Sequence, residues 1–436
     1  MSSRRDQVDA QRYMLTRVTG ALVRAEPETA ESPTRRDHTG TVAGLVFGVL
    51  LLGVIAVWAL FPGAAGSTRW QQPHMLVMDA STGARYVLTS GRLRPVNDIA
   101  TATLLAGGRL TPIVVASSTL AKVPHGEPVG TPDGPQVLPS VKQLNRGVWR
   151  ACDLGSGRVG LDVDVPAAAQ PLGAGEALSV TAGGKTYLLW GGRRLLLGEA
   201  WVADVLGMGL LAPVPVATSW LNLVPLSGTA APPVVSGAGG PGPTVAGKPT
   251  ALGQMFRVDM GNGAVGHYLM TAGGMAPLTD TEYLLERARP GSAGETAITS
   301  ADLAATTQRT PVHPLTTLPA TPPKPRSTPD GAAVCVEYTG RPDRGPTVVL
   351  ADTYATPAGK VTVRVPPGGG ALLLPRTDAD PQRQRGVLVD ERGVAYPVNG
   401  ADVTTLGYAP DQACVMPPAL VALLPTGPAL ARPERG

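Results

Sequence analysis

Eight residues from Gly242 to Pro249 have the glycine and lysine spacing of a phosphate-binding loop. In such a loop the backbone N–H groups hold the phosphates, and a Ser or Thr directly after the lysine binds magnesium. Pro249 stands in that position here, and Pro243 and Pro249 both lack a backbone N–H. No strand is expected directly before the loop. We therefore predict that this segment is not a working nucleotide site.

The other side chains with catalytic potential do not form a recognisable site. The histidines are scattered through the chain, at His38, His74, His125, His267 and His313. No GxSxG or HExxH motif is present in the sequence. Asp162 with Asp164, and Asp390 with Glu391, are pairs of the kind that glycosidases use, but such pairs are defined in space, and adjacency favours a solvated strand edge or turn. We predict no catalytic residue, no cofactor and no metal ion.

Three cysteines, Cys152, Cys335 and Cys414, are too far apart in sequence to resemble a zinc site. In an oxidising compartment one pair of them can close a disulfide. The residues alone leave all three pairings open.

The segment from Thr41 to Phe61 is an uninterrupted apolar stretch, and no charged residue lies between Asp37 and Arg69. About 20 apolar residues are enough to cross a bilayer, so the stretch predicts one transmembrane helix. A cleaved signal peptide is the alternative, but its apolar core is shorter and lies closer to the first residue. Within the stretch, Gly44 and Gly48 form a GxxxG motif, which is typical of helix–helix packing in membranes.

The flanks of this stretch indicate its orientation. Arg24, Arg35 and Arg36 lie close to its N-terminal end, whereas Arg69 and Arg85 are the first basic residues after it. An excess of Arg and Lys favours the cytoplasmic side. We expect a single-pass protein of the cytoplasmic membrane, with a cytoplasmic N-terminus and an extracytoplasmic C-terminal part.

Before the membrane, the residues from Asp6 to Ala25 have the periodicity of an amphipathic helix. Its apolar stripe consists of Val8, Leu15, Val18 and Leu22. A helix resting on the inner membrane surface and a helix docking on a cytoplasmic partner both fit this stripe.

The outer part has the composition of a folded protein, with 43% hydrophobic and 16% charged residues in the whole chain. Its 54 glycines and 44 prolines predict many turns and short elements. The net charge of +4 is small for this length and does not indicate nucleic-acid binding.

This outer part contains a repeated unit. Each copy has an apolar strand, a glycine-containing turn, a second strand centred on a tyrosine, and then a helix. The copies are 75–107, 178–207, 255–287 and a shortened 386–407, with Tyr86, Tyr187, Tyr268 and Tyr396 as the central tyrosines, which we expect to be core residues. Between the copies, 155–165, 333–339, 347–352 and 360–365 alternate as antiparallel strands do and predict a separate β-rich centre. The predicted fold is α+β: a single N-terminal transmembrane helix, then an elongated extracytoplasmic domain of four ββα-type repeats around a central β-rich domain.

The predicted boundaries follow from these patterns. They are a cytoplasmic segment 1–40, the transmembrane helix 41–61, repeat 1 at 62–107, the first part of the central β domain at 108–175, repeat 2 at 176–228, a Pro/Gly-rich connector at 229–253, repeat 3 at 254–290, a Pro/Thr-rich connector at 291–330, the second part of the central domain at 331–385, and repeat 4 with a C-terminal helix at 386–436.

The order of several motifs resembles a known family. DQVDAQRYMLTRVTGALVRAEPE, YVLTSGRLRPVNDIATATLL, VWRACD, VCVEY and YPVNGADVTTLGYAPDQACVMPPALVALLPTGPAL are similar to segments of EccB, a membrane core component of type VII (ESX) secretion systems. The resemblance implies a bitopic subunit that assembles with the FtsK-like ATPase EccC, with EccD and EccE, with the mycosin protease, and with further copies of itself. It also implies a disulfide between Cys152 and Cys335 and leaves the state of Cys414 undefined.

The resemblance therefore indicates a structural and assembly subunit of a secretion complex. Two alternatives stay open. The outer repeats can be a module that binds cell-wall glycans, with exposed Tyr or Trp residues stacking on sugars. A weak ATPase is the third hypothesis, since some family members are described as having this activity, although no intact phosphate-loop motif supports it here.

Overall fold

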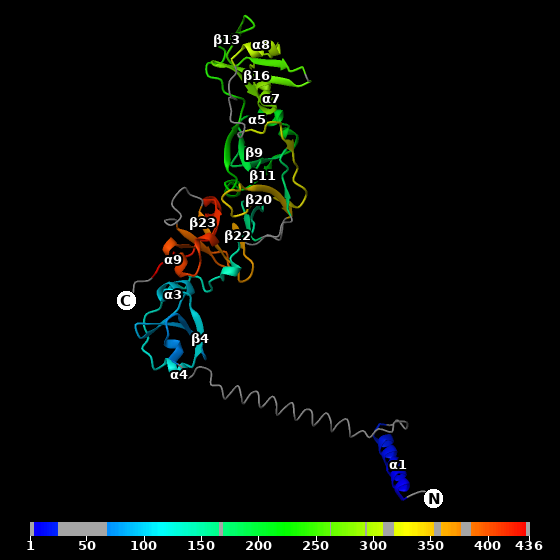
Figure 1. The fold of residues 1–436 in the computed structure, drawn as a ribbon, viewed down its shortest axis with the longest axis vertical. Coiled ribbons are helices and arrows are strands. Elements are labelled where there is room, and N and C mark those ends of the chain that lie inside the picture. The colour runs from blue at the N-terminus through cyan, green and yellow to red at the C-terminus, as the bar shows by residue number, and fades with distance from the viewer. Residues whose placement is uncertain are drawn as a thin grey trace. The chain divides into compact units, whose positions relative to one another are not determined.

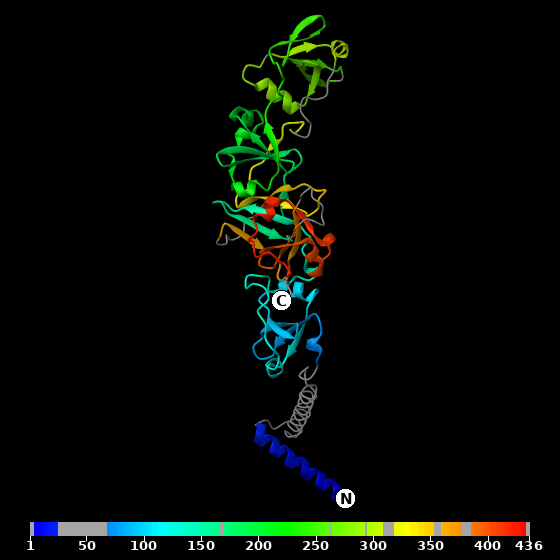
Figure 2. The same ribbon diagram turned by 90° about the vertical axis from the view of Figure 1, so that its left-hand side faces the viewer.

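The computed structural model describes residues 4–24, 68–164, 169–261, 263–292, 294–307, 318–352, 359–375 and 385–432 (Figure 1 and, turned by 90°, Figure 2). The predicted transmembrane segment 41–61, with Gly44 and Gly48, lies outside these residues. Within the described ranges no helix is both long enough and apolar enough to cross a membrane. The chain divides into two compact units, which consist of 1–72, 77–83 and 113–123 on one side and 73–76, 84–112 and 124–436 on the other.

The first unit contains the predicted N-terminal helix, α1 (Arg4–Arg24), and the short helices η1 (Thr68–Gln71) and α4 (Ser117–Leu120). It also holds most of β1 (Met75–Asp79) and of β4 (Thr111–Val115). Hydrogen bonds from Ser117, Thr82 and Ser81 hold the pKa of Asp79 well below its usual range. This carboxylate therefore ties the end of β1 to the start of α4.

The centre of the second unit is a six-stranded sheet in the order β22-β6-β5-β20-β21-β7. Its strands are β5 (Trp149–Asp153), β6 (Val159–Val163), β7 (Gln170–Pro171), β20 (Ala332–Tyr338), β21 (Thr347–Asp352) and β22 (Val361–Arg364). The four alternating stretches predicted as strands are thus present and lie in one sheet. Alternation predicted them well because every second side chain of each strand is apolar and lies on the face that packs in a shared apolar core.

Three further sheets of this unit share one strand order. Three antiparallel strands come first, a helix follows, and a fourth strand returns parallel to the first, which gives the order third-second-first-fourth. The first of these sheets has β8 (Glu176–Ala182), β9 (Lys185–Trp190), β10 (Arg193–Leu197), α5 (Ala200–Val205), η3 (Met208–Leu210), β11 (Val214–Pro215) and α6 (Thr218–Leu221). The second has β15 (Met255–Asp259), β16 (Val265–Thr271), β17 (Gly274–Leu278), α7 (Asp280–Ala288), β18 (Thr296–Ile298) and α8 (Ser300–Ala305). The third has β23 (Ala371–Pro375), β24 (Gly386–Val389), β25 (Ala395–Val398), α9 (Gly400–Thr405), η4 (Pro410–Gln412), β26 (Cys414–Met416) and α10 (Pro418–Val421).

The predicted ββα unit was therefore one strand too short before its helix. The missed strand is β10 in the second copy, β17 in the third and β23 in the shortened fourth. In the N-terminal copy it is β3 (Arg92–Pro95), which pairs with β2 (Arg85–Thr89) before α3 (Ile99–Ala106). Tyr396 consequently lies on the third strand of its sheet, not on the second. The first strand of that sheet, β23, falls in the range 331–385 that was assigned to the central domain.

The two predicted connectors also contain regular structure. The hairpin of β13 (Pro241–Val245) and β14 (Lys248–Ala251) lies within 229–253. The range 291–330 includes β18, α8 and β19 (Lys324–Pro325), and β19 pairs with β8. One more strand, β12 (Leu226–Ala230), runs parallel to β10. Pro and Gly content alone therefore misassigned these stretches as linkers, because short edge strands accept both residues.

Helix ends follow the sequence signals. Gly107, with φ 79°, ends α3 in the left-handed conformation. Thr279 and Glu282 form the capping box of α7, with Glu282 N–H donating to Thr279 Oγ1 at 3.3 Å and Thr279 N–H donating to Glu282 Oε2 at 2.9 Å. Both ends agree with the residue types, since glycine adopts positive φ without strain and Thr-x-x-Glu is the capping-box pattern.

Candidate interaction surface

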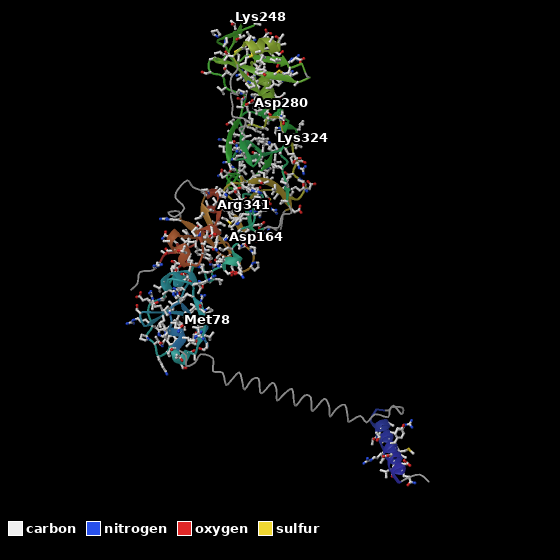
Figure 3. All side chains as sticks on the ribbon, in the orientation of Figure 1. Met78, Asp164, Lys248, Asp280, Lys324 and Arg341 are labelled. Atoms are coloured by element: carbon white, nitrogen blue, oxygen red, sulfur yellow. A yellow bond between two sulfur atoms is a disulfide. The ribbon has the colours of Figure 1, made fainter. Side chains whose placement is uncertain are left out.

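Helix α1 presents an uncovered apolar stripe. The exposed fractions of Val8, Leu15, Val18 and Leu22 are 53%, 61%, 55% and 80%. At 100° per residue these four side chains lie within about 80° of arc, on one side of the helix. Figure 3 draws the helix, in blue, with its side chains as sticks. An exposed stripe of this kind is a surface for binding another apolar surface, since a helix gains most of its stability by burying such a face.

The backbone of α1 is regular through its two threonines. Thr16 Oγ1 donates to the carbonyl of Arg12 at 2.8 Å, and Thr19 Oγ1 donates to the carbonyl of Leu15 at 2.7 Å. Their hydroxyls are thus occupied within the helix and do not compete for its N–H groups. No side chain of α1 is a nucleophile beside a base, so the surface offers binding and no chemistry.

The segment with phosphate-loop spacing folds as a β-hairpin. Val245 pairs with Lys248, and the two residues between them, Ala246 (φ 50°) and Gly247 (φ 72°), have positive φ, as in a type I′ turn. Lys248 is exposed, at the end of β14 that follows the turn, and Figure 3 labels it. A phosphate loop instead connects a strand to a helix whose N-terminal N–H groups face the phosphates. The geometry of this segment does not provide that arrangement.

Three of the four repeat tyrosines lie in or against apolar cores. Tyr268 and Tyr396 are 8% and 0% exposed, and Tyr187 packs against the core of the central sheet. Tyr86 is half-buried, with its ring edge-on to His125 at 5.8 Å between centroids. The Tyr396 hydroxyl donates to Asp390 at 3.2 Å. These positions favour packing over sugar stacking, which needs an open ring face.

The cysteines divide into one bonded pair and one buried thiol. Cys152 on β5 and Cys335 on β20 are direct cross-strand partners and form the disulfide that the resemblance implies. Cys414 is 4% exposed, and burial raises the pKa of its thiol. A buried, protonated thiol is a poor nucleophile, so Cys414 acts here as a small apolar side chain.

Sequence reasoning missed a row of charges across the central sheet. Glu337, Arg150, Asp162 and Arg364 are register neighbours on four adjacent strands, and their signs alternate. Arg150 Nη2 lies 2.6 Å from Glu337, and Arg364 Nη2 donates to Asp162 at 2.8 Å. Asp162 therefore belongs to an ion-pair ladder and not to a catalytic pair with Asp164. Only the register of the strands reveals this, because the four residues are far apart in sequence.

A second missed cluster joins α7 to its sheet. His267 Nδ1 lies 2.9 Å from Glu295 Oε1, and its ring stacks on Tyr283 at 3.6 Å between centroids. No group of three or more His, Cys, Asp or Glu residues able to hold a metal occurs in the ranges that the structure describes. His267 is therefore held as part of a surface cluster.

A family model described as "Type VII secretion system ESX-1, transport TM domain B" matches residues 1–434. The chain belongs to the EccB family. The ESX-1 secretion system ATPase EccB1 of Mycobacterium tuberculosis H37Rv is 26% identical over 460 residues, covering 98% of this chain and 92% of that protein. The ESX-3 secretion system ATPase EccB3 of the same strain is 28% identical over 256 residues, covering 54% of this chain and 46% of that protein.

Solved structures show the same fold. A chain of the intact ESX-5 inner membrane complex matches with a TM-score of 0.68 at 21% identity, over 99% of this chain and 94% of that one. A chain of the EccB3 dimer from the ESX-3 core complex matches with a TM-score of 0.67 at 23% identity, over 82% of this chain and 98% of that one. As an EccB protein, the chain is a structural subunit of a type VII secretion membrane complex.

Proposed function

We propose that this EccB protein assembles the secretion complex by binding other subunits on both sides of the membrane, and that it catalyses no reaction. The observation that carries the proposal is the pairing of a family match over nearly the whole chain with an uncovered apolar stripe on α1. In this account residues 41–61 span the cytoplasmic membrane once. The N-terminus is cytoplasmic and the repeats are extracytoplasmic, as the arginine distribution favours.

The partners in this proposal are those of the family. The α1 stripe docks on the cytoplasmic part of the complex, formed with the ATPase EccC and with EccD and EccE, while the mycosin protease and further EccB copies meet the outer repeats. The 41–61 helix packs beside other spans through Gly44 and Gly48, whose small side chains allow close approach. The sheets in the order third-second-first-fourth are copies of one repeated unit, and these copies pack on each other or on the central domain.

A direct test is gentle detergent extraction of the tagged full-length protein from its native host, followed by mass spectrometry of the proteins that co-purify. We expect an FtsK-like ATPase and multi-span subunits in one large particle. The variant Leu15→Glu/Val18→Glu, which charges the α1 stripe, should lose the cytoplasmic subunits. Arg17→Glu, on the opposite side of α1, is the matched control. Recovery of the protein alone, or only with wall fragments, would contradict the proposal.

The printed names of the relatives include ATPase activity, so hydrolysis is measured in the same preparation. For this chain the β13–β14 hairpin supports no phosphate site. Lys248→Ala should therefore leave any ATP turnover of the purified complex unchanged.

A further inference from the structure

Strand β8 has a break in the pairing along one of its edges. Two short strands lie on that edge, both parallel to β8: β19 pairs with residues 176–177, and β11 pairs with residues 180–181. Leu178 and Ser179, between these two pairings, have no register partner there. In the part of the chain that the structure describes, the other two sheets of this strand order have a single strand on the corresponding edge. The break is therefore a feature of this sheet and not of the repeat.

Ser179 directs a backbone donor into the break. Alternate residues of a strand turn their backbone groups toward the same edge. The carbonyl of Ala177 accepts from the N–H of Arg326 at 2.8 Å. The carbonyl of Thr181 accepts from the N–H of Val216 at 2.9 Å. Ser179 lies midway between Ala177 and Thr181, so its N–H points to this same edge, where no residue of β19 or β11 is in register with it.

A hollow of about 200 Å³ lies at the break, lined by Leu178 and Ser179 of β8, Val214 of β11 and Pro325 of β19. Ser179 is 6% exposed, and its hydroxyl has no hydrogen bond to a described residue. Thr328 also lines the hollow, and its Oγ1 is buried without a hydrogen-bond partner among the described residues. Buried hydroxyls are nearly always paired. Two unpaired hydroxyls at one hollow indicate that a ligand supplies the missing acceptors.

The charge at the hollow is basic. Arg326 is the one charged residue in its lining, as far as the described residues show. Its Nη1 lies 3.5 Å from Glu176 Oε1, and its Nη2 donates to Gln170 Oε1 at 3.2 Å. A guanidinium has five N–H donors, so these two contacts leave others for a ligand. An anionic acceptor beside Arg326 and Ser179 therefore fits the site, and a carboxylate is such an acceptor.

The rest of the wall is aliphatic, and the space is small. Met208, Leu211 and Val214 contribute most of this surface. Sites for drug-sized ligands measure about 300–1,000 Å³, so this hollow takes only a small group. A peptide that ran through the break would need more free strand edge than the two residues 178–179 provide. The last residue of a chain meets this limit, with its carboxylate at the donors and its side chain on the aliphatic wall.

We propose that this hollow binds the free carboxylate at the end of a peptide whose last residue is small and aliphatic. The Ser179 N–H and hydroxyl and the Arg326 guanidinium hold the carboxylate. Protein C-termini and the stem peptides of bacterial cell walls both carry this group, and the configuration of the last residue distinguishes these two sources. The site does not depend on the assembly role proposed above.

The test uses the full-length protein in detergent and fluorescence anisotropy of labelled peptides. Two probes end in L-Ala-L-Ala and in D-Ala-D-Ala, and each is made as a free acid and as a C-terminal amide. At least one free acid should bind saturably, and its amide should bind at least roughly tenfold more weakly. Tighter binding of the L form identifies a protein end as the ligand, and tighter binding of the D form identifies a wall peptide. No saturable binding of either acid, or equal binding of acid and amide, would overturn the proposal.

Variants then locate the binding at the hollow. Arg326→Gln should weaken the acid roughly tenfold, because it removes the positive charge. Lys324→Gln, at the exposed first residue of β19 that Figure 3 labels, is the matched control and should bind as the parent does. Equal effects of these two variants would overturn the proposal, since only Arg326 lines the hollow.

Ser179→Leu fills the hollow and should abolish binding. Its thermal midpoint shows whether the buried substitution is tolerated, and Arg326→Gln, with a side chain 37% exposed, decides the matter if it is not. Recovery of the other subunits with Ser179→Leu should be unchanged. Retained binding in a folded Ser179→Leu protein overturns the carboxylate site alone, whereas loss of the subunits from the parent protein overturns the assembly role alone.

Discussion

Two helix pairs join the repeats of the second unit, and they differ in chemistry. In the α3/α9 seam, Ala100 and Leu104 meet Val403, Leu406 and Tyr408 in an apolar cluster. In the α5/α7 seam, Leu285 enters the core of the neighbouring sheet, but α7 also buries Glu286, which is 1% exposed. The same topology thus supports two kinds of contact.

The difference has a physical consequence for stability. Burial raises the pKa of Glu286, and its pairing with Arg289 at 2.5 Å only partly offsets this. Its second carboxylate oxygen has no hydrogen-bond partner among the described residues. Burying an incompletely paired charge costs free energy, whereas an apolar contact does not. Glu286 should therefore make the stability of the α5/α7 seam depend on pH, whereas the apolar side chains of the α3/α9 seam add no such dependence.

The largest expected effect comes from a change that weakens both seams alike. The central sheet shares one core with the flanking sheets, and the Cys152–Cys335 disulfide joins strands 183 residues apart in sequence. Replacing both cysteines with alanine should lower the free energy of unfolding by about 2–5 kcal/mol. Amide hydrogen exchange should rise in α3, α9, α5 and α7 together. Cys414→Ala is the control, and a rise confined to one seam would show that the seams are anchored independently.

The second prediction compares the two apolar contacts directly. Leu104 and Leu285 are both 0% exposed, one in each seam. Leu104→Ala and Leu285→Ala should each cost about 3 kcal/mol, because each leaves a cavity in a packed core. Exchange should increase mainly in the mutated seam, which separates the two effects. A cost below about 1 kcal/mol for either variant would mean that its seam is loosely packed.

The smallest effect distinguishes the seams by pH. A carboxyl with a raised pKa in the folded protein is protonated in the native state when the unfolded chain has already lost its proton, so stability falls as the pH rises from about 4.5. Glu286→Gln removes this dependence. The variant's stability relative to the parent should grow with pH, reaching about 1 kcal/mol at neutral pH.

Thermal midpoints measured from pH 4 to pH 8 check this prediction. Glu127→Gln, at an exposed position, is the control, and its thermal midpoint should change with pH as that of the parent does. A constant difference between Glu286→Gln and the parent across this range would show that Glu286 keeps its ordinary pKa in the folded protein.

The sequence predicted those elements whose signal is local. The strand containing Leu161 alternates because its apolar side chains all lie on the face that packs in the shared core, and the Thr279 capping box lies within four residues of chain. Helix α1 has a clear 3.6-residue period and needs no partner to be seen in the sequence. Each of these is decided by neighbours along the chain.

The missed features depend on contacts that are distant in sequence. Strand β10, Arg-Arg-Leu-Leu-Leu, has no alternation in its sequence, because Leu196 is apolar although it lies on the half-buried face, between the buried Leu195 and Leu197. Strand β11 has only two residues, too few for any periodicity. In the sequence, Glu286 has the position of an ordinary surface residue on an amphipathic helix. Its burial is visible only in the packing of α7 against the neighbouring repeat. The charge ladder likewise exists only through strand register.

The central claim is that this EccB protein acts by assembly and not by catalysis, and export measured in living cells tests it most directly. In the native host lacking the gene, secretion of the type VII substrates would be compared for the parent, for Leu15→Glu/Val18→Glu and for Lys248→Ala. We predict that the α1 variant loses export although it is made and reaches the membrane, and that Lys248→Ala exports as the parent does. Normal export by the α1 variant together with loss of export in Lys248→Ala would contradict the account.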